Sequence, residues 1–242
     1  MLQVDGVTVA FGGIRALMDV DIDVEGNRIT GLIGPNGAGK TTLFNVITGL
    51  QRPRNGRVLL DGVDVTGKGP RARAKLGMGR TFQRLEVFGS LTALENVLVA
   101  VENRGGIGRG ARQRATELLG RVDLARMAGV QADVLPTGQA RLLELARALA
   151  CEPKVLLLDE PFSGLDANES SRLGDLLESL TSEGLAILLV EHDMEMVMRL
   201  CNRIHVLSFG SIIAAGTPSE IKADAAVQEA YLGAPVGAGS ES

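Results

Sequence analysis

The feature that most constrains this chain of 242 residues is a glycine-rich run between two apolar segments. The run reads Gly34-Pro35-Asn36-Gly37-Ala38-Gly39-Lys40-Thr41-Thr42, after the apolar residues 29–33 and before the apolar residues 43–47. Glycines let the backbone curl so that its N–H groups point inward, and a following helix adds its positive N-terminal end. Lys40 would then meet the β- and γ-phosphates of a nucleotide, and the Thr41 hydroxyl would be a ligand of Mg²⁺. The flanking pattern favours this phosphate loop over an incidental glycine-rich turn.

A second set of polar residues follows two other apolar runs. Asp159 and Glu160 come directly after residues 155–158, and His192 follows residues 185–190. Buried carboxylates are costly unless they pair with a metal or with donors, so two acids at a strand end indicate a function here. We expect Asp159 to hold Mg²⁺ directly or through water, Glu160 to act as general base, and His192 to reach the γ-phosphate. His205 lies inside a predicted strand, and we interpret it as structural.

Composition limits the class of protein. The chain is 45% hydrophobic and 22% charged, which is typical of a folded globular domain. A net charge of −4 provides no positive field for a phosphate backbone, so we expect no nucleic-acid partner. No apolar run approaches the roughly 20 residues of a membrane span, and residues 1–10 do not resemble a signal peptide. We therefore expect a cytosolic chain, whose two cysteines, Cys151 and Cys201, suit a reducing compartment.

Short β-type runs alternate with helical patterns, which predicts an α/β fold with a largely parallel central sheet. The predicted strands are residues 2–9, 20–24, 29–33, 58–60, 155–159, 185–190 and 204–207. Turn signals at residues 54–57 and 61–62 add a small antiparallel sheet.

The strand signal disappears over residues 84–150, which predicts a helical lobe. A capping box at residues 92–95 begins one helix, and another box at residues 217–220 begins a last helix. Residues 103–110 are expected to form an exposed loop. We predict one domain over residues 1–233, within the size that a single core allows, and a flexible tail over residues 234–242.

Together these residues resemble the ABC ATPase family over nearly the whole chain. The resemblance implies a P-loop NTPase core with a mostly parallel sheet, a small antiparallel β subdomain and an inserted helical lobe. It also implies that Gln83 contacts Mg²⁺ and the attacking water, that Asp166 belongs to a D-loop, and that His192 is the switch histidine. Phe11 matches the aromatic residue that stacks on adenine, although a single Phe is more often a core residue.

The signature sequence of that family, usually Leu-Ser-Gly-Gly-Gln, binds the ATP held by an opposite subunit. Here it reads Leu135-Pro136-Thr137-Gly138-Gln139. Gly138 and Gln139 match the pattern, whereas Pro136 stands at the serine position and has neither a hydroxyl nor a backbone N–H. Part of the contact to the opposite ATP is therefore missing from this signature, which would make the sites of a dimer unequal.

A narrower resemblance is to the ATPases of branched-chain amino-acid importers, carried by Phe11-Gly12-Gly13, residues 79–83, 94–97 and 190–194, and the end of the chain at 230–233. It implies ATP and Mg²⁺ as ligands, a second ATPase subunit in a homo- or heterodimer, transmembrane permeases and, indirectly, an external solute-binding protein. It also implies a peripheral position on the cytoplasmic face of the membrane. Urea or amide importers and the lipopolysaccharide-export ATPase share much of the pattern. A non-transport ABC protein acting on ribosomes or DNA, and a regulatory module without turnover, are the alternatives of another class.

Overall fold

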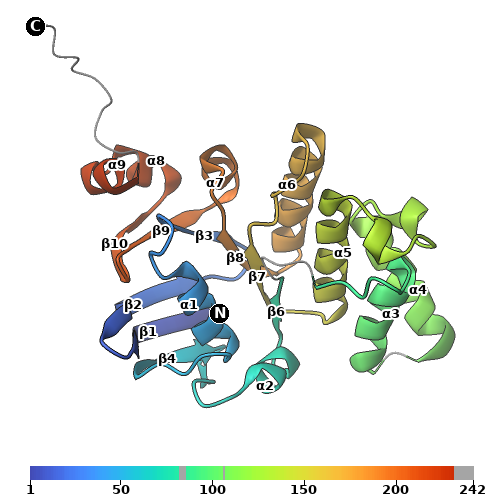
Figure 1. Ribbon diagram of the computed structural model, residues 1–242, viewed down its shortest axis with the longest axis horizontal. Coiled ribbons are helices and arrows are strands. Elements are labelled where there is room, and N and C mark those ends of the chain that lie inside the picture. Colours follow the sequence, from blue (N-terminus) through green and yellow to red (C-terminus); the bar gives the residue numbers. More distant parts are fainter. Residues whose placement is uncertain (82–85, 106, 232–242) are drawn as a thin grey trace, which may run out of the picture.

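The fold contains two sheets with helices between and around them (Figure 1). The structure is a computed structural model that describes residues 1–81, 86–105 and 107–231. The larger sheet has six strands in the order β10-β9-β3-β8-β7-β6. In chain order these are β3 (Ile29–Ile33), β6 (Met78–Arg80), β7 (Val155–Asp159), β8 (Ala186–Val190), β9 (Arg203–Ser208) and β10 (Ser211–Gly216). All neighbours pair in parallel except β9 and β10.

The smaller sheet is antiparallel, as the turn signals predicted. Its strands are β1 (Leu2–Phe11), β2 (Ile14–Val24), β4 (Asn55–Leu60) and β5 (Val63–Asp64), in the order β2-β1-β4-β5. Asp61 and Gly62, with φ of 51° and 77°, form the tight turn between β4 and β5. Two central turn residues with positive φ match the right-handed twist of the strands that they connect.

Helix α1 (Lys40–Thr48) lies between the two sheets, and its residues Leu43, Phe44, Val46 and Ile47 are buried. The alternation of side chains along each strand explains this layer. Val155 and Leu157 of β7 belong to the cluster around α1, whereas Leu156 and Leu158 belong to the cluster on the other side of the sheet. The six-stranded sheet is therefore buried on both faces, as continuous apolar strands of a parallel sheet require.

Helices cover the second face of the large sheet. Those that contribute to its core are α3 (Ala93–Asn103), α4 (Gly108–Arg121), α5 (Thr137–Ala150), α6 (Ala167–Ser182), α7 (Met194–Leu200), α8 (Pro218–Ala223) and α9 (Ala225–Tyr231). Helices α3, α4 and α5 pack on one another at one end of the molecule (Figure 1). Two short 3₁₀ segments, Ala125–Met127 and Ala132–Val134, connect α4 to α5, and α2 (Pro70–Lys75) precedes β6. No helix in the described ranges is both long and apolar enough to cross a membrane.

Several predicted elements differ from the structure at their boundaries. Capping boxes begin α3 at Thr92 and α8 at Thr217, as predicted. The expected loop over residues 103–110 is shorter, because α3 includes Asn103 and α4 already begins at Gly108. Strand β6 was not predicted, since its short glycine-containing sequence carries no alternating signal. The predicted tail, residues 234–242, lies outside the described residues, and the bounds of the domain and of the helical lobe stay predictions.

His205 of β9 is buried, and it lies opposite Leu32 of β3 and Ala215 of β10. Burial lowers the pKa of His205 to about 4, Arg203 adds to the decrease, and Asp23 opposes it. The folded protein therefore binds fewer protons at this position than the unfolded chain does between pH 4 and the ordinary value of 6.5.

We predict that the free energy of unfolding decreases as the pH is lowered from 6.5 to 4, with a contribution from His205 of up to about 3 kcal/mol. Urea unfolding at pH 7, 6 and 5 measures this, and His205→Leu is expected to reduce the slope. Equal slopes for wild type and His205→Leu would contradict the prediction.

Candidate functional site

A cavity of about 500 Å³ lies where the carboxyl ends of β3, β7 and β8 meet the start of α1. Ligands bind in this position in open α/β sheets. The cavity is lined by Ile14, Arg15, Ala16, Asn36, Gly37, Gly39, Lys40, Thr41, Thr42, Asp159, Glu160, Val190, His192, Phe209 and Gly210. Residues that were selected from three separate sequence motifs are thus neighbours in space.

The glycine-rich run curls because two of its residues cannot carry a side chain. Gly34 has φ of 155°, and a Cβ there would lie 2.0 Å from the Leu207 carbonyl oxygen. Gly39 has φ of 113°, and its Cβ would lie 2.7 Å from the Ala16 carbonyl oxygen. Gly39 is also the N-cap of α1 and provides no side-chain cap, so the first N–H groups of the helix are available to an anion.

Lys40 lies inside the curled loop. Its Nζ donates to the carbonyl oxygens of Gly34 at 2.5 Å and Pro35 at 3.0 Å. Burial lowers the pKa of Lys40, while the nearby Glu160 and Asp159 carboxylates oppose the decrease. Gly34 and Ala38 are buried, and Ala38 packs in the core. The ammonium group is therefore held at the floor of the cavity beside two acids.

Asp159 ends β7 and is buried. Its Oδ2 lies 3.6 Å from Arg80 Nη2, and its backbone N–H donates weakly to Thr81 Oγ1 at 3.4 Å. Burial raises the pKa of Asp159, while the Arg80 guanidinium opposes the increase. Thr41 lines the same cavity, so a hydroxyl and a carboxylate oxygen, which are hard ligands suited to Mg²⁺, occur together. In the described part of the chain no group of three or more Asp, Glu, His or Cys side chains is arranged to hold a metal ion.

Glu160 and His192 form a pair across the ends of β7 and β8. His192 Nε2 lies 2.8 Å from Glu160 Oε1. Glu160 has φ of 52°, a left-handed conformation that is uncommon for a non-glycine residue, and its N–H donates to the Val190 carbonyl oxygen at 2.9 Å. Such backbone strain is concentrated at functional sites.

Glu191 supports this pair and was not selected from the sequence as a site residue. It is buried, and its carboxylate accepts hydrogen bonds from the N–H groups of Phe162 at 3.0 Å, His192 at 2.8 Å and Asp193 at 3.4 Å. Burial raises the pKa of Glu191, and these hydrogen bonds oppose the increase. The carboxylate fixes the turn that presents His192. Its only sequence signal is an acid directly after an apolar strand.

The other predicted residues lie away from the cavity or at its edge. Phe11 ends β1 opposite Ile14 and is 51% exposed, and it does not line the cavity, whereas Ile14 does. Asp166 is the N-cap of α6 and accepts from the Glu169 N–H at 2.8 Å. Gln83 lies outside the described residues.

The signature residues lie at the start of α5. Leu135 precedes the helix, Pro136 is its N-cap without a side-chain hydrogen bond, and Gly138 and Gln139 are in its first turn. A Cβ at Gly138 would lie 2.6 Å from Leu165 Cδ2 and 3.2 Å from the Gly164 carbonyl oxygen, so a side chain there would displace Leu165 in the segment before α6. None of these residues lines the cavity around the glycine-rich loop.

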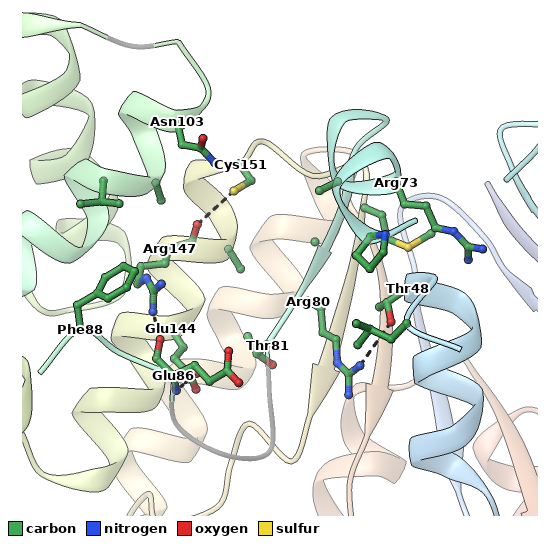
Figure 2. A pocket seen from close by; sticks show the side chains of 18 residues that line it. Thr48, Arg73, Arg80, Thr81, Glu86, Phe88, Asn103, Glu144, Arg147 and Cys151 are labelled. Atoms are coloured by element: carbon green, nitrogen blue, oxygen red, sulfur yellow. Dashed lines mark hydrogen bonds between the residues drawn. The ribbon is translucent and has the colours of Figure 1, made fainter. Parts of the chain in front are cut away.

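Further along α5, two side chains hold the segment that follows residues 82–85. Glu144 accepts a hydrogen bond from the Glu86 N–H at 2.7 Å, and Arg147 donates to the Glu86 carbonyl oxygen. The Arg147 guanidinium also lies 4.7 Å from the centre of the Phe88 ring. These contacts form one wall of a second cavity, of about 520 Å³, between the α3–α5 helices and β6 (Figure 2).

Comparison with known proteins agrees with this geometry. The family profile of ABC transporters matches residues 17–163, which contain the glycine-rich loop and both acids. The chain belongs to the ABC transporter family. A second profile, that of the branched-chain amino acid ATP-binding cassette transporter, matches residues 211–236.

Individual relatives match almost the whole chain. It is 39% identical to the high-affinity branched-chain amino acid transport ATP-binding protein BraF of Pseudomonas aeruginosa, over 96% of this chain and 98% of BraF. It is 34% identical to the lipopolysaccharide export system ATP-binding protein LptB of Haemophilus influenzae, over 96% of this chain and 97% of LptB. A dimeric ATP-binding cassette bound to ADP and Pi has a TM-score of 0.82 and 29% identity, covering 90% of this chain and 99% of that one. The chain is thus a nucleotide-binding ABC ATPase subunit.

We predict that Lys40→Ala lowers the affinity for ATP by about 10- to 100-fold, because a hydrogen bond to a charged group contributes about 1.5–3 kcal/mol. Fluorescence titration with an ATP analogue measures the affinity. Lys154→Ala removes an exposed lysine that pairs with Asp61 and should bind as the wild type does. An unaltered affinity for Lys40→Ala would contradict the predicted role of the loop.

Proposed function

We propose that this chain powers an ABC importer for branched-chain or other neutral amino acids. The similarity to BraF over the whole chain supports this solute class, together with the second profile over residues 211–236. The observation that carries the ATPase chemistry is the cavity that joins the glycine-rich loop to Asp159, Glu160 and His192. The similarity to LptB makes lipopolysaccharide export the second candidate.

In the proposed reaction the loop amides of residues 34–42 and the Lys40 ammonium bind the β- and γ-phosphates. Glu160 accepts a proton from the attacking water, and His192, 2.8 Å from Glu160, orients the water and the γ-phosphate. Phe11, half-exposed beside Ile14 of the cavity wall, would stack on the base. Most of the rate acceleration then comes from positioning and charge stabilisation, because phosphoryl transfer needs little covalent chemistry from the protein.

Thr41 and Asp159 are the residues that we assign to Mg²⁺, and Gln83 is assigned by family resemblance alone. When bound, the ion neutralises charge that develops on the phosphate oxygens. The oxygen-only donor set of Thr41 and Asp159 supports this assignment.

The signature residues are proposed to act across a dimer. Leu135, Gly138 and Gln139 would contact the ATP of a second ABC ATPase subunit, with the amides at the start of α5 as donors. Asp166 would contribute from the segment that packs on Gly138. The dimeric state of the ADP-bound relative supports such an assembly. Pro136 provides neither a hydroxyl nor an N–H to this contact, so a site built from this signature lacks part of the usual set.

The remaining partners follow from the same proposal. Transmembrane permease subunits would contact the cavity between the α3–α5 helices and β6, which places the chain peripherally on the cytoplasmic face of the membrane. An external solute-binding protein would contribute only through the permeases.

Purification of the chain from its native membrane identifies the permeases that bind it. Reconstitution of that complex in vesicles, with ATP on the side of this chain, then tests the solute. ATP-dependent uptake of labelled leucine or another neutral amino acid is expected. Extraction of lipopolysaccharide without amino-acid uptake would favour the second candidate.

We predict that Glu160→Gln keeps the affinity for ATP within about threefold and reduces turnover by about 10²- to 10⁴-fold, the usual contribution of a general base. ATP should then accumulate a closed dimer, which gel filtration detects. Glu183→Gln changes an exposed glutamate paired with Arg121, and it should retain wild-type turnover. Unchanged turnover in Glu160→Gln would refute the assignment of the base.

A further inference from the structure

Arg80 lies at the end of β6 with only 9% of its side chain exposed, although no predicted role required a buried cation there. Its backbone pairs with Leu157 of β7, two residues before Asp159. Because side chains alternate along a strand, Arg80 shares a face with Met78, which belongs to the cluster around α1. Figure 2 shows the Arg80 guanidinium directed toward Thr48 of α1.

Three residues of α1 hold this guanidinium in place. Nη1 donates to Asn45 Oδ1 at 2.8 Å and to Thr48 Oγ1 at 3.5 Å. The guanidinium carbon lies 5.5 Å from the centre of the Phe44 ring, within the range of a cation–π contact. One nitrogen of Arg80 is thus anchored on the helix that begins with Lys40 and Thr41.

The other terminal nitrogen faces the carboxylate at the end of β7. Nη2 lies 3.6 Å from Asp159 Oδ2, and both side chains are almost completely buried. Breaking a buried ion pair leaves an uncompensated charge, so the contact restricts where the carboxylate can lie. Arg80 therefore connects the helix of the phosphate loop to the acid on the opposite strand.

We propose that Arg80 is a positioning residue that holds the Asp159 carboxylate at the distance from α1 at which it can share a magnesium ion with Thr41. The inference rests on the proposed function, in which Asp159 and Thr41 are the magnesium ligands. Arg80 touches neither nucleotide nor water in this role. It acts through Asp159, as residues behind a metal ligand do when they orient it.

The role predicts a specific change in magnesium dependence. Arg80→Met removes the charge and the hydrogen bonds to Asn45 and Thr48, and it should raise the magnesium concentration for half-maximal binding of an ATP analogue by about 10- to 100-fold. Binding of the same analogue in EDTA should stay within about twofold of wild type, because the loop amides and Lys40 are unchanged. Arg80→Lys, which keeps the charge, should recover part of the magnesium affinity. Electron paramagnetic resonance of Mn²⁺ in the presence of the analogue measures the metal affinity directly, without ATP turnover.

Arg73→Met is the matched control. Arg73 is also buried and also contacts the end of α1, where its guanidinium donates to the backbone carbonyls of Val46 at 2.7 Å and Ile47 at 2.5 Å. The carboxylate that acts on Arg73 is that of Asp64, whereas Arg80 pairs with Asp159. Its loss should lower the melting temperature and leave the magnesium dependence unchanged. If Arg80→Met lowers the melting temperature in the same way and also leaves the magnesium dependence unchanged, Arg80 is only a structural tie and the proposal is wrong.

Two further measurements keep the result interpretable. Arg80→Gln retains a donor for Asn45 without the charge, and it carries the test if Arg80→Met does not fold. Asp159→Asn reports on the proposed function itself. A normal magnesium dependence in Asp159→Asn would refute the magnesium site, whereas an effect of Asp159→Asn without an effect of Arg80→Met or Arg80→Gln would refute only the role of Arg80.

Discussion

Helix α1 lies between two sheets with its apolar side chains buried, and the polar groups of the site are placed relative to its first turn. The helix cannot shift along its axis without disturbing both sheets, because close-packed interiors transmit small displacements. The glycine-rich loop and Lys40 are thereby fixed at one point. The carboxyl ends of β7 and β8 are fixed beside it, since both strands belong to the sheet on which α1 packs.

This arrangement explains how acids and a buried lysine coexist in one cavity. Lys40 is compensated by loop carbonyls and by the two acids, Asp159 by Arg80, and Glu191 by three backbone N–H groups. Each buried charge has a partner provided by a rigid element, which is the condition under which buried charge is tolerated. The site is therefore pre-organised by the fold, and a nucleotide enters a cavity whose walls are already held in place.

Much of the fold and of the site could be predicted because the signals are local. The glycine-rich loop carries its own flanking strand and helix, and the apolar runs of β3, β7 and β8 are short and clearly bounded. Asp159, Glu160 and His192 could be grouped because parallel strands bring their carboxyl ends to one edge. The contacts of Arg80 and Glu191 could not be predicted from the sequence. Those of Arg80 depend on strand order and on which residues face α1, and those of Glu191 depend on the turn before Asp193. Strand β6 escaped prediction for the same reason, as its three residues are ordered by pairing with β7.

Helix α5 joins the signature residues to the segment that follows residues 82–85. Its first turn carries Gly138, packed against Leu165, and its middle holds Glu86 and Phe88 through Glu144 and Arg147. Because α5 is one continuous helix of 14 residues, its two ends are expected to move together. A tilt that moves the signature end has to carry residues 86–88 with it or break the hydrogen bond to the buried Glu144 carboxylate.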